Sequence, residues 1–180
     1  IGNGAGIALR WAESYRLGIG HAPLANLYES LVFFAFTIGI IHLVVERRYA
    51  NRTLGAFTAP LAFLAMAYAS LSPHISDRIQ PLIPALKSNW LIAHVITCFI
   101  GYAAFAIAFG VSWMYILKQR GGGRPGPLVD HLPDSRVLDE LNHQLVMFGF
   151  LFLSAGIITG AVWAHSAWGR YWGWDPKETW

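Results

Sequence analysis

The residues best suited to chemistry lie in the last eighteen positions, 163–180. Five of the eight tryptophans of the chain fall in this segment, and it also holds Arg170, Asp175 and Lys177. An indole ring is flat and apolar on its faces and carries one N–H at its edge. Tryptophans therefore line sites for flat ligands and also favour the boundary between membrane and water. The segment predicts one of two things: a site for a flat ligand or an aromatic belt at a membrane surface.

A second candidate is His94, one of seven histidines, which follows Trp90 at the start of an apolar stretch. An imidazole can bind a metal through one ring nitrogen while a hydrogen bond holds the other. A histidine near the end of a membrane helix can equally well hydrogen-bond a backbone carbonyl. Position alone leaves both interpretations open.

The elements that must position these residues are apolar helices. Of the 180 residues, 55% are hydrophobic and 13% are charged, about half the charged fraction of a soluble domain. The chain should therefore be an all-α polytopic membrane protein, since a span needs about 20 apolar residues. We expect four transmembrane helices, over residues 24–45, 56–71, 91–117 and 144–162.

The basic residues predict how these spans are oriented. The loops 46–55 and 118–143 hold seven lysines and arginines, whereas the loop 72–90 holds two. Basic residues concentrate on the cytoplasmic side, so the segment 163–180 should lie on the outer face. Arg10 and Arg16 would then also lie outside, which disagrees mildly with the same rule.

Further expectations concern the charge, the single cysteine and the remaining segments of the chain. The small net charge of +3 and the absence of a basic aromatic cluster argue against nucleic-acid binding. The single cysteine, Cys98, excludes an internal disulfide and should be a buried apolar residue. Residues 1–9 are expected to end a preceding helix, 10–23 to form a polar connector, and 134–143 a short surface helix; both ends look like those of a fragment.

The order of the residues is more specific than their types. The run WGRYWGWDPKETW at 168–180 resembles the tryptophan-rich WWD segment of the CcsA (ResC) family of cytochrome c assembly proteins. Three more stretches resemble the same family: HAPLANLYE at 21–29, PALKSNWLIAH at 84–94 and LDEL at 138–141. Together they extend along the whole chain.

This resemblance implies a function. Proteins of this family bind haem b as cargo at the outer membrane face and present it to the CxxCH motif of apocytochrome c, together with a ResB-type membrane subunit. They lie in the bacterial inner membrane or the thylakoid membrane. The chain would be at most one subunit of a haem lyase, and none of its residues is expected to act as a base or nucleophile.

The resemblance also suggests site residues. It makes His94 an axial ligand of the haem iron, and Trp168, Trp172 and Trp174 would line the haem. Arg170 or Lys177 would pair with a propionate. Asp175 would contact the site or cap a helix starting at Pro176. The family's second outer histidine and its membrane histidine lie beyond the WWD segment, outside this sequence.

Some alternatives remain open. CcmC and CcmF share the tryptophan-rich segment, and a membrane transport or interaction module could use the tryptophans only as an anchor. His165 would be a substitute ligand or a surface residue. His42, in an apolar span, would be functional or form a helix–helix hydrogen bond. Glu29 would likewise be functional or pair with Arg16 or Lys87.

Overall fold

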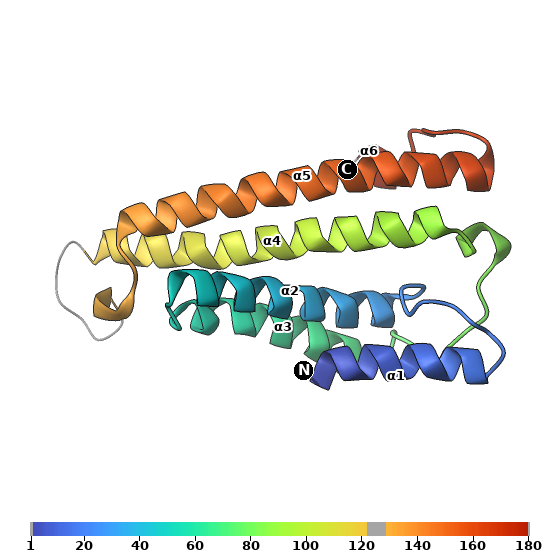
Figure 1. Ribbon diagram of the computed structural model, residues 1–180, viewed down its shortest axis with the longest axis horizontal. Helices are drawn as coiled ribbons and strands as arrows, with labels where there is room; N and C mark the ends of the chain where they lie inside the picture. Colours follow the sequence, from blue (N-terminus) through green and yellow to red (C-terminus); the bar gives the residue numbers. More distant parts are fainter. Residues whose placement is uncertain (1, 122–128, 180) are drawn as a thin grey trace.

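The computed structural model describes residues 2–121 and 129–179, and all regular secondary structure in this part is helical. Its elements, shown in Figure 1, are α1 (Gly2–Arg16), α2 (Leu27–Tyr49), α3 (Leu54–Leu71), η1 (Pro84–Leu86), α4 (Asn89–Arg120), η2 (Val129–His131), α5 (Ser135–Trp168) and α6 (Pro176–Thr179). No strand occurs among the described residues. The predicted all-α architecture is confirmed.

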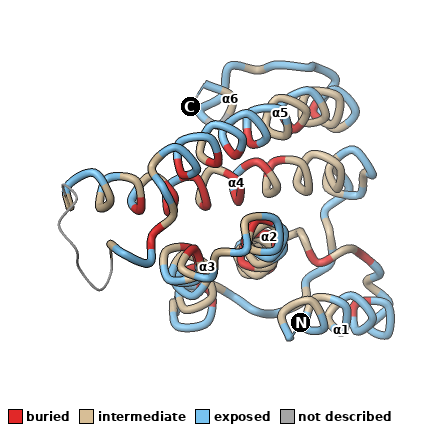
Figure 2. Tube along the Cα trace, turned by 60° about the vertical axis from the view of Figure 1, so that its left-hand side comes forward, coloured by how far each residue is buried: buried red, intermediate tan, exposed pale blue. Residues whose placement is uncertain are grey.

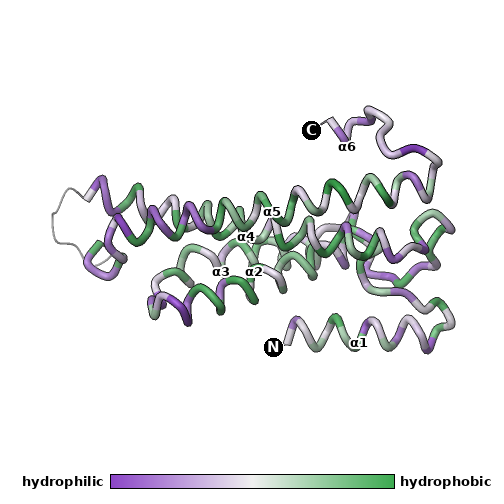
Figure 3. The backbone as a smooth tube through the Cα atoms, turned by 45° about the horizontal axis from the view of Figure 1, so that its top comes forward, coloured by the Kyte–Doolittle hydropathy of each residue, from purple (hydrophilic) through white to green (hydrophobic). Residues whose placement is uncertain are grey.

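Four helices are long and apolar enough to cross a membrane. They are α2, α3, α4 and α5, with 23, 18, 32 and 34 residues. Figure 3 shows hydrophobic residues along their middle parts and hydrophilic residues towards their ends. Since a helix rises 1.5 Å per residue, each approaches or exceeds the roughly 30 Å thickness of a bilayer core. The expectation of four helices able to span a membrane is confirmed.

Local capping explains where two of these helices start. Asn26 caps α2 by accepting a hydrogen bond from the Glu29 N–H at 2.8 Å, so α2 begins at Leu27 rather than at residue 24. Ser88 caps α4 by accepting from the Trp90 N–H at 3.2 Å.

Two sequence-based expectations are wrong. Residues 10–23 do not form a connector, because α1 continues to Arg16 and only 17–26 join it to α2. Most of the polar residues between 10 and 16 face solvent, and Arg10 donates from Nε to the Glu29 carboxylate of α2 at 2.8 Å. The predicted surface helix over 134–143 is not separate either, since α5 runs unbroken from Ser135 through the last span.

The helices form an elongated bundle with two distinct ends. We call the end where α4 starts and α5 finishes the tryptophan end, and the opposite end, with residues 46–55, 118–121 and 129–134, the basic end (Figure 1). At the basic end, Thr53 donates from Oγ1 to the His131 carbonyl at 3.0 Å. The two loops rich in basic residues therefore lie at the same end, as their spacing by two crossings predicts.

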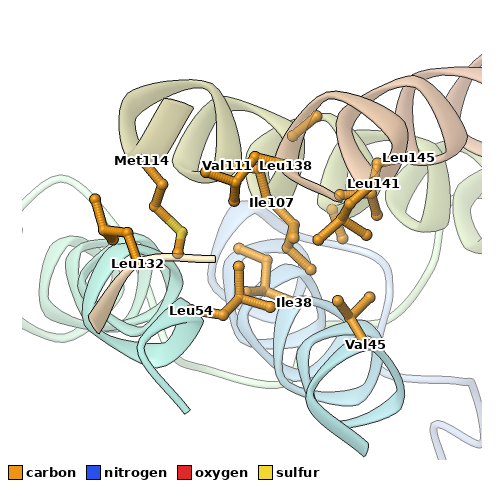
Figure 4. Close-up of a cluster of buried hydrophobic side chains, with 12 residues drawn as sticks. Ile38, Val45, Leu54, Ile107, Val111, Met114, Leu132, Leu138, Leu141 and Leu145 are labelled. Carbon is orange, nitrogen blue, oxygen red and sulfur yellow. The ribbon is translucent and has the colours of Figure 1, made fainter. Parts of the chain in front are cut away.

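Helices α4 and α5 pack side by side along most of their length, and the α2–α3 hairpin lies against α4 (Figure 1). A cluster of buried hydrophobic residues joins α2, α3, α4 and α5 in the half nearer the basic end, and Figure 4 shows Ile38, Ile107 and Leu138 meeting there. Figure 2 shows buried residues on the faces where helices meet and exposed residues on the outward face of α5. This packing holds α4 and α5 in fixed register at the tryptophan end.

Candidate functional site

His94 lies just over one turn into α4, at the tryptophan end, and its ring is turned towards α5. Its Nδ1 lies 2.7 Å from the Gly156 carbonyl oxygen of α5. Because a carbonyl only accepts hydrogen bonds, Nδ1 carries the proton and Nε2 keeps its lone pair. The structure thus contains the bond to a carbonyl that position alone suggested, and the same bond leaves one nitrogen able to bind a metal.

Trp163 of α5 covers the His94 ring. The two rings are nearly parallel, with an interplanar angle of 14° and centroids 6.2 Å apart. Trp163 is itself held by a hydrogen bond from its Nε1–H to the Ala85 carbonyl of η1, at 2.9 Å. Its ring also meets Trp168 edge-on, with centroids 4.7 Å apart. Three rings, His94, Trp163 and Trp168, therefore form a continuous aromatic row.

Trp163 was missed as a site residue by sequence reasoning. It belongs to the same tryptophan-rich segment as the expected residues, so its type was a signal. Its contact with His94 depends on the register between α4 and α5, and that register cannot be read from the sequence.

An open hollow lies beside this row at the end of the bundle. It is lined by residues of η1, by Lys87 and Ser88 before α4, and by Ser166, Ala167 and Trp168 at the end of α5. Trp168 is 56% exposed. The hollow thus combines an indole ring with a lysine that could pair with an anionic group.

The segment after α5 turns back (Figure 3), and its Tyr171 ring stacks on His165 of α5. Trp172 and Trp174 contact each other edge-on, with centroids 6.0 Å apart, and both are exposed. Trp174 adopts a left-handed backbone conformation with φ of 57°, which is unusual for a large side chain. The guanidinium of Arg170 lies close over Gly173, where an added Cβ would be 3.0 Å from Arg170 Cζ.

Asp175 is the N-cap of α6, as one of its two predicted roles requires. Its Oδ1 accepts a hydrogen bond from the Glu178 N–H at 3.1 Å, and Glu178 Oε2 accepts in return from the Asp175 N–H at 3.2 Å. This reciprocal pair is a capping box. Glu178 also accepts from the Gly173 N–H at 2.6 Å, so the carboxylates shape the backbone around the exposed tryptophans.

The structure brings together only part of the predicted site. His94 and Trp168 are joined through Trp163, whereas Trp172 and Trp174 form a separate pair. The side chain of Lys177 and the whole of Trp180 lie outside the described part of the structure.

The remaining candidates have structural partners. His165 is exposed and stacks on Tyr171, with centroids 4.2 Å apart. His42 forms the predicted helix–helix hydrogen bond, with its Nδ1 3.0 Å from Thr58 Oγ1, and its Nε2 is 3.0 Å from Glu46.

Glu29 pairs with Arg10, and not with Arg16 or Lys87 as expected. Its partner was hidden because residue 10 was assigned to a connector rather than to a helix beside α2.

Among the described residues, no group of three or more histidines, cysteines and acidic residues is placed to hold a metal ion. His94 therefore does not belong to a metal-binding cluster of this kind within the described residues.

The fold and the site together define a class of protein: a polytopic helical membrane protein. At one end it carries a tryptophan-rich segment and a histidine, His94, whose Nδ1 is hydrogen-bonded to the neighbouring helix. The family model described as Cytochrome C assembly protein matches residues 24–180, and the chain belongs to that family. Within the family it is of the CcsA type, as the resemblance implied.

Two similar proteins illustrate the relationship, both called cytochrome c biogenesis protein CcsA. The protein of Parasynechococcus marenigrum (strain WH8102) is 37% identical over 200 aligned residues, covering 97% of this chain and 63% of the relative. That of Synechococcus elongatus (strain ATCC 33912 / PCC 7942 / FACHB-805) is 34% identical, covering 97% and 66%. The chain thus spans somewhat less than two thirds of the length of the first of these relatives.

Proposed function

We propose that this protein acts in cytochrome c biogenesis by binding haem b at the outer membrane face and presenting it to apocytochrome c. One observation carries the proposal: His94 has its Nδ1 bonded to Gly156 and its Nε2 left for a metal, at the same end as the tryptophan-rich segment. Membership of the cytochrome c assembly family supports the same reading.

The residues at the tryptophan end suit haem in kind. His94 Nε2 would be an axial ligand of the iron, and its bonded Nδ1 fits the usual arrangement of metal-binding histidines. Trp168, Trp172 and Trp174 are exposed, and their flat indole rings would suit a flat apolar macrocycle. Arg170 and Lys177 would pair with propionates, while Asp175 shapes the segment by capping α6.

The chemical step asks little of the protein beyond placement. Each cysteine thiol of a CxxCH motif adds across a haem vinyl group, so that sulfur joins one carbon and the thiol hydrogen the other. The protein would hold reduced haem and the peptide in the orientation that this addition needs. The chain would then be one subunit of a haem lyase, working with a ResB-type membrane partner.

The proposed orientation follows from charge. The basic end would face the cytoplasm because both loops rich in lysine and arginine lie there. The tryptophan end would then face the outside of a bacterial inner membrane or the lumen of a thylakoid.

The test is the visible spectrum of the full-length protein purified with its partner, compared with His94→Ala. We expect a low-spin haem spectrum that is lost or weakened in the variant and restored by added imidazole. A full haem content with an unchanged spectrum in His94→Ala would assign the iron to other residues. A wild-type complex without haem would overturn the proposal.

A second candidate function is favoured by the exposure of Trp172 and Trp174, which suits an aromatic anchor at the membrane boundary. In that case Trp172→Phe and Trp174→Phe, which keep an apolar ring, would leave cytochrome c maturation and haem content unchanged. A role in haem binding predicts a loss of haem in both.

A CcmC-type or CcmF-type partnership would instead appear as co-purification with other assembly subunits.

A further inference from the structure

We infer that Gly156 and Gly160 of α5 are positioning residues for His94: one sets the tautomer of its ring and the other leaves the space that the ring occupies. The inference rests on the proposed role of His94 as a haem ligand. It assigns a function to two glycines that otherwise only bring helices together.

The three α5 residues around His94 lie on one face of that helix. Gly156, Gly160 and Trp163 are separated by four and then three positions, the spacing of a single helical stripe. Gly156 supplies a carbonyl to Nδ1 at 2.7 Å, and Trp163 supplies a ring parallel to the imidazole. Gly160 lies between them, and its lack of a side chain leaves the space that the His94 ring occupies.

The Gly156 carbonyl sets the tautomer because it cannot donate a proton. The other group near Nδ1 is the Cys98 thiol, whose sulfur is 3.6 Å away and which is a much weaker partner. Thr159 is also close to the Gly156 oxygen, at 3.0 Å, but its hydroxyl has a shorter bond to the Ala155 carbonyl at 2.9 Å. The Nδ1 proton is therefore held by Gly156, and Nε2 is left as the metal-binding atom.

Gly160 is required by the position of the ring. A Cβ at residue 160 would lie 2.6 Å from His94 Nδ1 and 2.7 Å from Cε1. Carbon atoms do not approach that closely, so even an alanine would push the ring away. Because the ring is tied to Gly156 and covered by Trp163, moving it breaks the hydrogen bond and displaces Nε2.

Gly156 has its own close neighbour, which allows a repair. A Cβ there would lie 2.6 Å from Cys98 Sγ, so Gly156→Ala should push α4 and α5 apart. Cys98→Ala removes that sulfur while the carbonyl of residue 156 is kept, and the next atoms, the Cys98 nitrogen and Thr97 Oγ1 at 3.3 Å, need to move by only a few tenths of an ångström. The double variant should therefore recover the contact between residue 156 and His94.

The main experiment compares Gly160→Ala with Gly149→Ala in the full-length protein and its partner. Gly149 lies in the same α4–α5 interface. A Cβ there would meet the Phe105 ring at 3.0 Å and not His94. We expect Gly160→Ala to weaken haem binding by about 10-fold to 100-fold, the usual effect of disturbing a residue behind a metal ligand. Its spectrum should shift from low spin towards high spin, whereas Gly149→Ala should keep the low-spin spectrum.

A second readout does not need haem. In haem-free protein labelled with ¹⁵N-histidine, the ring signals that disappear in His94→Gln should be those of a neutral imidazole protonated at Nδ1. Gly160→Ala should change them to a mixture of tautomers, and Gly149→Ala should leave them unchanged.

Each outcome decides a different point. A His94 ring protonated at Nε2 in the wild type, or equal spectra for Gly160→Ala and Gly149→Ala, would overturn the inference while leaving the haem site intact. Should Gly160→Ala not accumulate in membranes, Gly156→Ala decides instead: it should lose low-spin haem and recover it with Cys98→Ala. Failure of that recovery also overturns the inference. A haem-free wild type, with the Nδ1 tautomer present, counts against the proposed function alone.

Discussion

Glu29 is the clearest example of a residue whose chemistry depends on a neighbour far along the chain. Its side chain is 1% exposed, and its two carboxylate oxygens accept from Arg10 Nε and from the Ala25 N–H, each at 2.8 Å. A buried carboxylate is tolerated only when paired and hydrogen-bonded. This one ties α1 to the start of α2 at the tryptophan end.

Replacing Glu29 by Gln should therefore destabilise the protein by about 3 kcal/mol, because Arg10 keeps its charge without a partner. The measurement is reversible unfolding in detergent micelles. Arg10→Met in the same chain should restore part of the loss. Glu13 is exposed on α1, the helix that carries Arg10, so Glu13→Gln should stay within about 0.5 kcal/mol of wild type. An equal loss of stability in Glu29→Gln and Glu13→Gln would argue against the ion pair.

Ala50 offers a stabilising change at the opposite end. It follows α2 with φ of 50° and ψ of 32°, a left-handed conformation that disfavours a residue with a Cβ. Ala50→Gly should stabilise the protein by about 1 kcal/mol, seen as a raised midpoint of thermal unfolding. The same change at exposed Ala56, inside α3, should lower the midpoint, since glycine weakens a helix interior.

At the scale of elements, the close approach of α4 and α5 depends on small residues placed between the two backbones. A Cβ on Gly101 would lie 3.0 Å from the Gly149 carbonyl oxygen and 3.1 Å from the Leu153 nitrogen. These are backbone atoms of α5, so they can move only if the helix moves. The helix pair that carries His94 and Trp163 is thus held at a distance set by glycine.

Gly101→Ala should accordingly destabilise the protein by about 1–3 kcal/mol, as expected when a packed interface is overfilled. Gly149→Ala should cost less, because its Cβ would meet a side chain, Phe105, that can rotate. Unfolding midpoints of the two variants in the same detergent would compare them. A smaller loss for Gly101→Ala would mean that the helices adjust easily.

For the whole molecule, the two ends of the bundle differ in charge and in chemistry. The basic end carries the loops rich in arginine and lysine and lies near the main hydrophobic cluster. The tryptophan end carries the buried polar groups His21 and Glu29 and the aromatic row from His94. A membrane would separate these ends, since the apolar helices between them must lie in its core.

This arrangement predicts opposite accessibility for two introduced cysteines in a Cys98→Ser background. Asp77 lies in the exposed loop at the tryptophan end. The cysteine of Asp77→Cys should therefore react with a membrane-impermeant maleimide in intact cells. Arg52→Cys, exposed at the basic end, should react only after the cells are opened. Labelling in the reverse pattern would invert the proposed orientation, and labelling of both in intact cells would contradict a spanning bundle.

The amino-acid sequence by itself determined the four apolar helices, because backbone groups in a bilayer must be satisfied within a helix and such helices need long apolar runs. It also determined the family, through the letters of the segment 168–180, and the cap at Asp175, because a capping box is a local pattern. The type and position of His94 made it a candidate, and the resemblance in the segment 84–94 made it the expected ligand.

Only the tertiary structure decided what surrounds these residues. The bond from His94 to Gly156 joins positions 62 apart, and that from Trp163 to Ala85 joins positions 78 apart. Both depend on the register of α4 against α5, which side-chain packing sets. The partner of Glu29 was likewise decided by tertiary contact, because Arg10 lies on another helix, and no local pattern reveals that pairing.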